Sequence, residues 1–284
     1  MKKFDYYQPE KLKEALGLME KMKGNARYVA GGTDILCRIK QKLLRPDALI
    51  SLRGIRALRG ITPNGGLSLG SMTRFRELER DFSVARDYPG LAQAVWVLAN
   101  PQIRNVATIG GNLCNAAPSA DTAPPLMVME ANLIIEGPGG WRKVPIQDFF
   151  KGPGQNCMEG AEILTQIQIP KKEPRTGVKF LKIGRVSQDI AVANAAALVV
   201  MEGKICRKCR LAVGAVAPVP LRLTAIEKMV EGEEISADLL DRVGKMVEEQ
   251  VAPISDVRST EVYRRQVTGA LVTRAIRQAL DEIG

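Results

Sequence analysis

Tyr28-Val29-Ala30-Gly31-Gly32-Thr33-Asp34-Ile35 places paired glycines and a threonine directly after an apolar stretch that has the pattern of a strand. Ala107-Thr108-Ile109-Gly110-Gly111-Asn112-Leu113-Cys114-Asn115 repeats the arrangement and continues to Pro118-Ser119-Ala120-Asp121. Glycine tolerates positive φ and has no Cβ, so successive backbone N–H groups can converge on an anion. Either stretch alone could be an ordinary tight turn. Together, the two stretches could hold one diphosphate between them.

The composition is that of a self-contained globular protein. The chain has 284 residues, enough for two domains, and 45% of them are hydrophobic. The longest apolar run, 190–201, is interrupted by Asn194 and is too short to span a membrane. The N-terminus lacks the apolar core of a signal peptide, and five cysteines, an odd number, fit a reducing compartment. We therefore expect a cytoplasmic protein without a membrane span.

The chain contains no histidine, which excludes several kinds of catalytic site. Ser-His-Asp and Cys-His sites, histidine-liganded zinc and histidyl attachment of a flavin all require this side chain. Carboxylates could still act as acids or bases, but no carboxylate pair stands out. A chain with few catalytic side chains and two phosphate-binding stretches is expected to leave its chemistry to a cofactor.

The net charge of +10 permits more than one interpretation. A basic excess is typical of nucleic-acid-binding proteins, yet aromatic residues make up only 5% and do not alternate with basic ones. There is no P-loop and no G-x-G-x-x-G fingerprint after a strand. These observations favour solvated basic faces and attraction for an anionic cofactor or an acidic partner.

The pattern of elements predicts an α+β fold in two parts. In the first part we expect helices at 9–23, 34–44, 89–98 and 122–129, and strands at 27–30, 48–52, 58–61, 67–70, 133–135, 142–144 and 163–169. The charged, turn-rich segment 171–177 is the expected domain boundary. Beyond it we expect a three-stranded sheet with helices on one face, from strands at 178–183, 191–201 and 206–216 and helices at 225–230, 237–250 and 259–283.

Cys206 and Cys209 form a single C-x-x-C pair. Zinc and iron–sulfur sites usually need four ligands, and no second pair follows. Structural thiols on a strand are therefore the favoured interpretation, and we expect no metal.

The two glycine stretches resemble the FAD-binding loops of the flavin subunit of molybdenum hydroxylases. This family includes the medium chain of carbon monoxide dehydrogenase and the flavin domain of xanthine dehydrogenase. The resemblance continues at Lys182-Ile183-Gly184-Arg185 with Asp189-Ile190-Ala191, at Gly214-Ala215-Val216-Ala217-Pro218 and at Tyr263-Arg264-Arg265. It implies a two-part FAD-binding domain at 1–172, with subdomains of about 1–54 and 55–172, and a C-terminal flavoprotein domain at 173–284.

The resemblance also implies a noncovalent FAD site. Backbone amides of Ala30, Gly31, Gly32 and Thr33, with the Thr33 hydroxyl, would donate to the pyrophosphate. Thr108, Gly110, Gly111 and Asn112 would hold the same phosphates from the other side, and Asp121 would accept hydrogen bonds from ribose or ribityl hydroxyls. The implied cofactor-binding residues are Val29, Ala30, Gly31, Gly32, Thr33, Asp34, Ile35, Thr108, Gly110, Gly111, Asn112, Cys114, Asp121, Ile163, Leu164 and Lys182.

Several of these residues have alternative roles. Asp34 and Asp121 could each cap a helix, Lys182 could be a plain exposed lysine, and Cys114 is expected to pack rather than to react. Arg185 and Asp189 could form a structural pair.

By the same resemblance, the chain would be the electron-transfer subunit of a heteromeric dehydrogenase and would carry no catalytic residue of its own. A molybdopterin-binding large subunit would oxidise the substrate, and [2Fe–2S] clusters of a small subunit would pass electrons to FAD. NAD, ferredoxin or a quinone could be the external acceptor. The alternatives are a free-standing FAD enzyme resembling the cell-wall enolpyruvyl reductases, and a basic nucleic-acid-binding protein.

Overall fold

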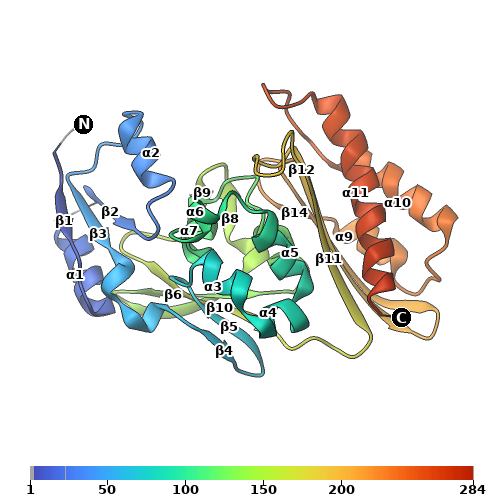
Figure 1. The fold of residues 1–284 in the computed structure, drawn as a ribbon, viewed down its shortest axis with the longest axis horizontal. Helices are drawn as coiled ribbons and strands as arrows, with labels where there is room; N and C mark the ends of the chain where they lie inside the picture. The colour runs from blue at the N-terminus through green and yellow to red at the C-terminus, as the bar shows by residue number, and fades with distance from the viewer. Residues whose placement is uncertain (1–2, 23, 284) are drawn as a thin grey trace.

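The computed structural model describes residues 3–22 and 24–283. Figure 1 shows a row of sheets along the long axis of the molecule, from the blue N-terminal strands to the red C-terminal helix. The sheets of the first part are formed within residues 5–170, and the sheet of the second part within residues 176–222.

The N-terminal part is a small parallel sheet with the strand order β1-β3-β2. Its elements are β1 (Asp5–Tyr7), α1 (Leu12–Lys21), β2 (Ala26–Val29), α2 (Ile35–Lys40) and β3 (Ala48–Ser51). The apolar positions of α1 pack on this sheet, whereas α2 buries only Ile39. The first glycine stretch begins where β2 ends, at the carboxyl edge of parallel strands, where α/β sheets commonly bind ligands.

The middle part is a five-stranded antiparallel sheet in the order β4-β5-β10-β6-β7. Its strands are β4 (Ile61–Pro63), β5 (Gly66–Gly70), β6 (Asn132–Gly137), β7 (Gly140–Pro145) and β10 (Ile163–Pro170), with a small hairpin of β8 (Phe150–Gly152) and β9 (Gln155–Asn156). The helices are α3 (Phe75–Arg80), α4 (Phe82–Asp87), α5 (Pro89–Val97), α6 (Pro101–Arg104), α7 (Ile109–Asn115) and α8 (Ala123–Val128).

The C-terminal sheet is antiparallel in the order β11-β12-β13-β14. The strands are β11 (Thr176–Ile183), β12 (Ala193–Glu202), β13 (Ile205–Gly214) and β14 (Leu221–Arg222), and the helices are α9 (Thr224–Val230), α10 (Ala237–Gln250) and α11 (Glu261–Asp281). The expected three strands are present, and the two-residue β14 adds a fourth.

The helices of this domain pack on one face of the sheet, as expected, and the other face is covered as well. Along β12, Ala195 and Ala197 pack toward α10 and α11, whereas Ala196 and Leu198 join the core that contains α5 and α8. Helices of the first part thus cover the second face (Figure 1). Burial on both sides explains why β12 is an apolar run rather than an alternating one.

Two sequence-based expectations about local structure were wrong. The strand expected at 58–61 begins only at Ile61, because 56–58 form a 3-10 turn. The second glycine stretch follows helix α6 and a turn rather than a strand, and it is itself the first turn of α7. In the part of the chain that the structure describes, no helix has the length and apolar character needed to cross a membrane.

Candidate functional site

The two glycine stretches lie against each other. A Cβ on Gly31 would lie 2.4 Å from the carbonyl oxygen of Val106, so only glycine allows this approach. Asn115 Nδ2 donates a hydrogen bond to Asp34 Oδ1 over 3.1 Å and joins the two stretches. The sequence therefore folds so that both stretches line one site.

The first stretch presents unpaired backbone donors. Gly32 has φ of +85°, a conformation that glycine adopts without strain, and α2 begins three residues later. Within residues 3–22 and 24–283, the amides of Gly31, Gly32 and Thr33 donate to no protein acceptor. Successive N–H groups without partners are what an anion-binding concavity requires.

The second stretch has a different geometry from the one expected. Gly110 N donates to Ser71 O (2.9 Å), Gly111 N donates to the Thr108 hydroxyl (3.1 Å) and Asn112 N donates to Thr108 O (3.0 Å). Thr108 is thus the N-cap of α7. The helix and Ser71 therefore already engage these three amides, and the phosphate contact expected of Thr108, Gly110, Gly111 and Asn112 stays a prediction.

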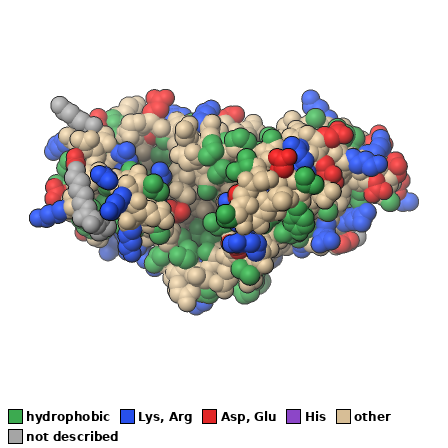
Figure 2. All heavy atoms as spheres, turned by 90° about the horizontal axis from the view of Figure 1, so that it is seen from above, with side chains coloured by type: hydrophobic (Ala, Val, Ile, Leu, Met, Phe, Trp, Pro, Cys, Tyr) green, Lys and Arg blue, Asp and Glu red, His purple; other side chains and the backbone are tan. Residues whose placement is uncertain are grey.

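A cavity of about 650 Å³ lies between the stretches. Figure 2 looks down on the molecule and shows a hollow with hydrophobic side chains between the N-terminal part and the middle. Of the sixteen implied cofactor-binding residues, fifteen line the cavity: Ala30, Gly31, Gly32, Thr33, Asp34, Ile35, Thr108, Gly110, Gly111, Asn112, Cys114, Asp121, Ile163, Leu164 and Lys182. Val29 does not, since its side chain packs in a core with Ile39 and Leu49.

Asp34 does not cap α2. Its backbone occupies the N-cap position, but its carboxylate accepts hydrogen bonds from Asn115 and from the Thr33 hydroxyl (3.3 Å) rather than from a helix amide. The structure therefore favours a site role over the capping alternative.

Asp121 and Lys182 form a buried ion pair that lines the cavity. Lys182 Nζ lies 2.6 Å from Asp121 Oδ2 and also donates to Val97 O, while Asn194 Nδ2 donates to Asp121 Oδ1 over 3.0 Å. Burial raises the pKa of the Asp121 carboxyl, and the Lys182 ammonium and the Asn194 amide act against this. The alternative role of Asp121 as a helix cap does not hold, because Thr122 occupies the N-cap position of α8. Lys182 is not a plain exposed lysine either, because its side chain is only 6% exposed.

Ile163 and Leu164 reach the cavity through an irregularity of β10. The register with β6 shifts between Leu164 and Gln166, which turns the strand locally. Both side chains are buried and line the cavity. This end of the site is apolar.

Cys114 is a packing residue, as expected. Its Sγ lies 3.7 Å from Met158 Sδ, and burial raises the pKa of the thiol to about 12. Such a thiol holds almost no thiolate at neutral pH and is a poor nucleophile. Arg185 and Asp189 form the expected pair, with Nε and Oδ2 separated by 2.7 Å.

Cys206 and Cys209 both face the core beneath α9–α11. Their spacing of three would place them on opposite faces of a regular strand, but β13 has an irregularity at Arg207 that brings both to the same face. A hydrogen bond between the thiols lowers the pKa of Cys206 and raises that of Cys209. Across the described residues, no three potential metal-ligating side chains gather.

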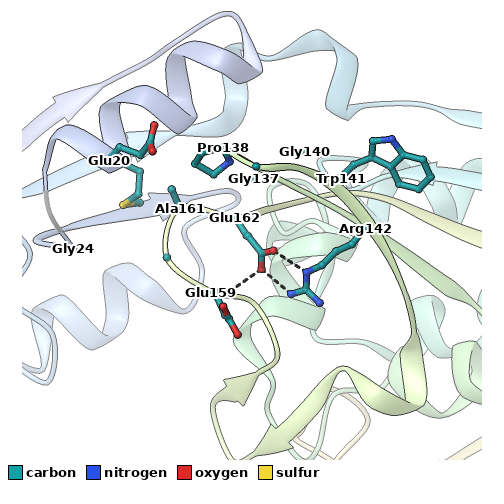
Figure 3. A pocket seen from close by; sticks show the side chains of 13 residues that line it. Glu20, Gly24, Gly137, Pro138, Gly140, Trp141, Arg142, Glu159, Ala161 and Glu162 are labelled. Atoms are coloured by element: carbon teal, nitrogen blue, oxygen red, sulfur yellow. Dashed lines mark hydrogen bonds and ion pairs between the residues drawn. The ribbon is translucent and has the colours of Figure 1, made fainter.

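A second cavity, of about 710 Å³, lies between the α1–β2 turn and the β6–β7 hairpin (Figure 3). Two of its charged lining residues are paired with each other, because Arg142 donates to both carboxylate oxygens of Glu162 at 2.7 Å, and Glu159 N donates to the same carboxylate. No implied site residue lines this cavity.

Sequence reasoning missed other residues that line the first cavity, including Arg38, Ser71, Leu98, Ser119 and Gln188. Arg38 and Ser119 lie close to the two stretches in sequence, so the stretches could have indicated them. Ser71, Leu98 and Gln188 come from other segments, and no local pattern marks them.

Two family models together match nearly the whole chain. Residues 2–172 match the FAD binding domain in molybdopterin dehydrogenase, and residues 179–279 match the CO dehydrogenase flavoprotein C-terminal domain. The chain belongs to this flavoprotein family. Its cofactor is FAD, and it is a subunit of an oxidoreductase.

The relatives of this flavoprotein match it over its full length. The xanthine dehydrogenase FAD-binding subunit of Escherichia coli O157:H7 is 34% identical, with 98% of this chain and 97% of the relative covered. The glyceraldehyde dehydrogenase medium chain of Sulfolobus acidocaldarius is 32% identical, with 97% and 98% covered. The structure of carbon monoxide dehydrogenase from Hydrogenophaga pseudoflava contains a chain that superposes with a TM-score of 0.96 at 30% identity, covering 99% of this chain and 98% of that one.

The cavity of this flavoprotein fits FAD. The unpaired amides of Gly31, Gly32 and Thr33 suit a diphosphate, and the apolar end at Ile163 and Leu164 suits a flat aromatic ring. The Asp121–Lys182 pair adds a polar end that can hydrogen-bond hydroxyl or carbonyl groups.

Proposed function

We propose that this flavoprotein relays electrons within a molybdenum hydroxylase-type dehydrogenase. Electrons would come from [2Fe–2S] clusters of a small partner subunit, which receive them from a molybdopterin-binding large subunit, and would leave to an external acceptor such as NAD. Bound FAD supplies the two-electron redox chemistry. The chain's own residues hold and orient that cofactor.

The observation that carries this proposal is the composition of the cavity. It offers the unpaired amides of Gly31, Gly32 and Thr33, polar side chains and one buried ion pair, and burial raises the pKa of its thiol, Cys114. A substrate-oxidising site would need a positioned proton acceptor or nucleophile beside the ring. The carboxylates among the described lining residues are already engaged, because Asp121, Glu162 and Asp189 are in ion pairs and Asp34 accepts hydrogen bonds from Asn115 and Thr33. This supports a cofactor-holding role.

We assign roles to the residues of the site on the same basis. The amides of Gly31, Gly32 and Thr33 bind the diphosphate, and α7 contributes the side chains of Thr108 and Asn112 and its N-terminal dipole. Asp121 binds hydroxyl groups through its remaining lone pairs. Ile163, Leu164 and Lys182 border the isoalloxazine ring.

Stopped-flow measurement of flavin bleaching tests whether electrons reach FAD only through the partner subunits. The chain alone, loaded with FAD, is mixed with the organic substrate of its complex, and the reaction is repeated after reconstitution with the partner subunits. We expect bleaching only in the reconstituted complex. Rapid bleaching of the lone chain by the substrate would instead identify a free-standing FAD enzyme.

A further inference from the structure

Ser71 follows directly after β5 and contacts Gly110 of the second glycine stretch. Its carbonyl oxygen accepts the hydrogen bond of Gly110 N, and its own amide donates to Thr165 O over 3.0 Å. A Cβ on Gly110 would lie 2.5 Å from Ser71 Cβ, so the two residues are in direct contact. Ser71 therefore connects the first turn of α7 with the bend of β10 that carries Leu164 to the cavity.

The hydroxyl of Ser71 is a buried polar group without a partner. The residue is 3% exposed, and its Oγ makes no hydrogen bond to any described residue. Buried hydroxyls are nearly always satisfied, and an unpaired one destabilises the fold. Ser71 also lines the FAD cavity. A group that enters this cavity would supply the missing partner.

We propose that Ser71 is a cofactor-binding residue whose hydroxyl hydrogen-bonds an oxygen of the ribityl–diphosphate segment of FAD. Its backbone bonds Gly110, which lies in the second glycine stretch, and Thr165, which follows the cavity-lining Leu164. The oxygen-rich ribityl segment of FAD joins its diphosphate to its ring. A hydroxyl can donate to a phosphate oxygen or exchange hydrogen bonds with a ribityl hydroxyl.

The chain provides a matched control in Ser68. Its hydroxyl is also buried and without a partner among the described residues, at 4% exposure on β5, but it does not line the FAD cavity. Ser68→Ala and Ser71→Ala make the same chemical change three residues apart. Only the second should affect FAD.

The dissociation constant for FAD, measured by quenching of flavin fluorescence, tests the proposal. Loss of one hydrogen bond predicts a rise of about threefold to tenfold for Ser71→Ala and no change for Ser68→Ala. Ser71→Cys, which preserves the size of the side chain and weakens the donor, should resemble Ser71→Ala. An unchanged affinity in Ser71→Ala, or an equal loss in Ser68→Ala, would overturn the assignment.

Thermal unfolding of the apoprotein separates binding from a merely structural role. Because the Ser71 hydroxyl has no protein partner, apo Ser71→Ala should unfold at or above the temperature of the apo wild type. The stabilisation added by FAD should be smaller in the variant. A lower unfolding temperature of the apo variant with unchanged stabilisation by FAD would make Ser71 a packing residue and refute the proposal.

Discussion

Asp121 and Lys182 are 61 residues apart in sequence and come from the two parts of the chain, yet their charged groups lie 2.6 Å apart at the FAD cavity. Asn194 on β12 donates to the same carboxylate, so β11 and β12 are both joined to the segment before α8. The pair thus fixes the C-terminal sheet against the FAD-binding part at the cofactor. One ion pair couples assembly of the fold to assembly of the site.

Lys182→Met should be strongly destabilising, because it leaves the Asp121 carboxylate buried without its counter-charge. We expect a loss of about 3–5 kcal/mol in the free energy of unfolding, measured by urea denaturation. The matched control is Lys179→Met on the same strand, where the ammonium pairs with Glu282 over 3.4 Å nearer the surface. That change should cost about 1 kcal/mol or less. Equal losses in both variants would argue against a special role of the buried pair.

Substitution of the glycines should empty the FAD site. Gly32→Val adds positive-φ strain of about 1–3 kcal/mol, and Gly111→Val places Cβ 2.9 Å from the Thr108 hydroxyl that caps α7. Purified variants should contain little FAD, whereas Gly17→Val, where a Cβ meets nothing within 4 Å, should retain it. From wild type, acid should release all of the flavin as FAD, not FMN. Normal flavin content in both variants, or flavin left on the protein, would contradict this.

Cys206 and Cys209 should hold no metal, because two buried thiols supply only half of a usual ligand set. Elemental analysis of anaerobically purified protein should give iron and zinc well below one per chain. Cys206→Ser should leave these values unchanged. Stoichiometric iron that disappears in the variant would indicate a cluster shared with a partner.

Assembly with the partner subunits should depend on the charge of the N-terminal part. Residues 1–60 contain 14 Lys and Arg against 6 Asp and Glu, which accounts for +8 of the net +10. Lys40, Lys42 and Arg45 are exposed, and reversing all three to Glu should weaken assembly by about tenfold at low salt and flatten its salt dependence. The control, Lys245→Glu with Arg274→Glu and Arg277→Glu, makes the same change in charge on α10 and α11. If both triple variants weakened assembly equally, net charge rather than this surface would be responsible.

The contribution of Asp256 to stability should disappear in acid. Hydrogen bonds from Arg258 and Arg264 hold the pKa of its carboxyl well below the ordinary value of about 3.9. A lowered folded-state pKa stabilises the protein above the unfolded-state pKa, and this stabilisation is lost as the pH falls through the folded-state value. The difference in unfolding free energy between wild type and Asp256→Asn should be constant from pH 7 to 5 and shrink below about pH 4. A difference that persisted unchanged in acid would show that charge is not the cause.

Much of the architecture follows from local sequence. The apolar spacing of α10 and the apolar runs of β11–β13 each depend on neighbours within a few positions, and these elements formed where the pattern predicted them. The glycine stretches also identified the cavity, because close backbone approach leaves glycine as the only choice at Gly31. The resemblance to the family then identified FAD as the expected cofactor.

Other features depend on contacts between distant segments, which no local pattern contains. The sequence alone determined that residues 108–112 contain a threonine and paired glycines. Only the tertiary structure shows that the amides of residues 110–112 already donate hydrogen bonds to Ser71 and to Thr108 at the start of α7. The sequence also placed an acid at 121 and a lysine at 182, whereas only the packing of the C-terminal sheet on α5 and α8 brought them to 2.6 Å. Hydrogen bonds and ion pairs form within a few ångströms in space, and chain topology, rather than local propensity, decides which groups come that close.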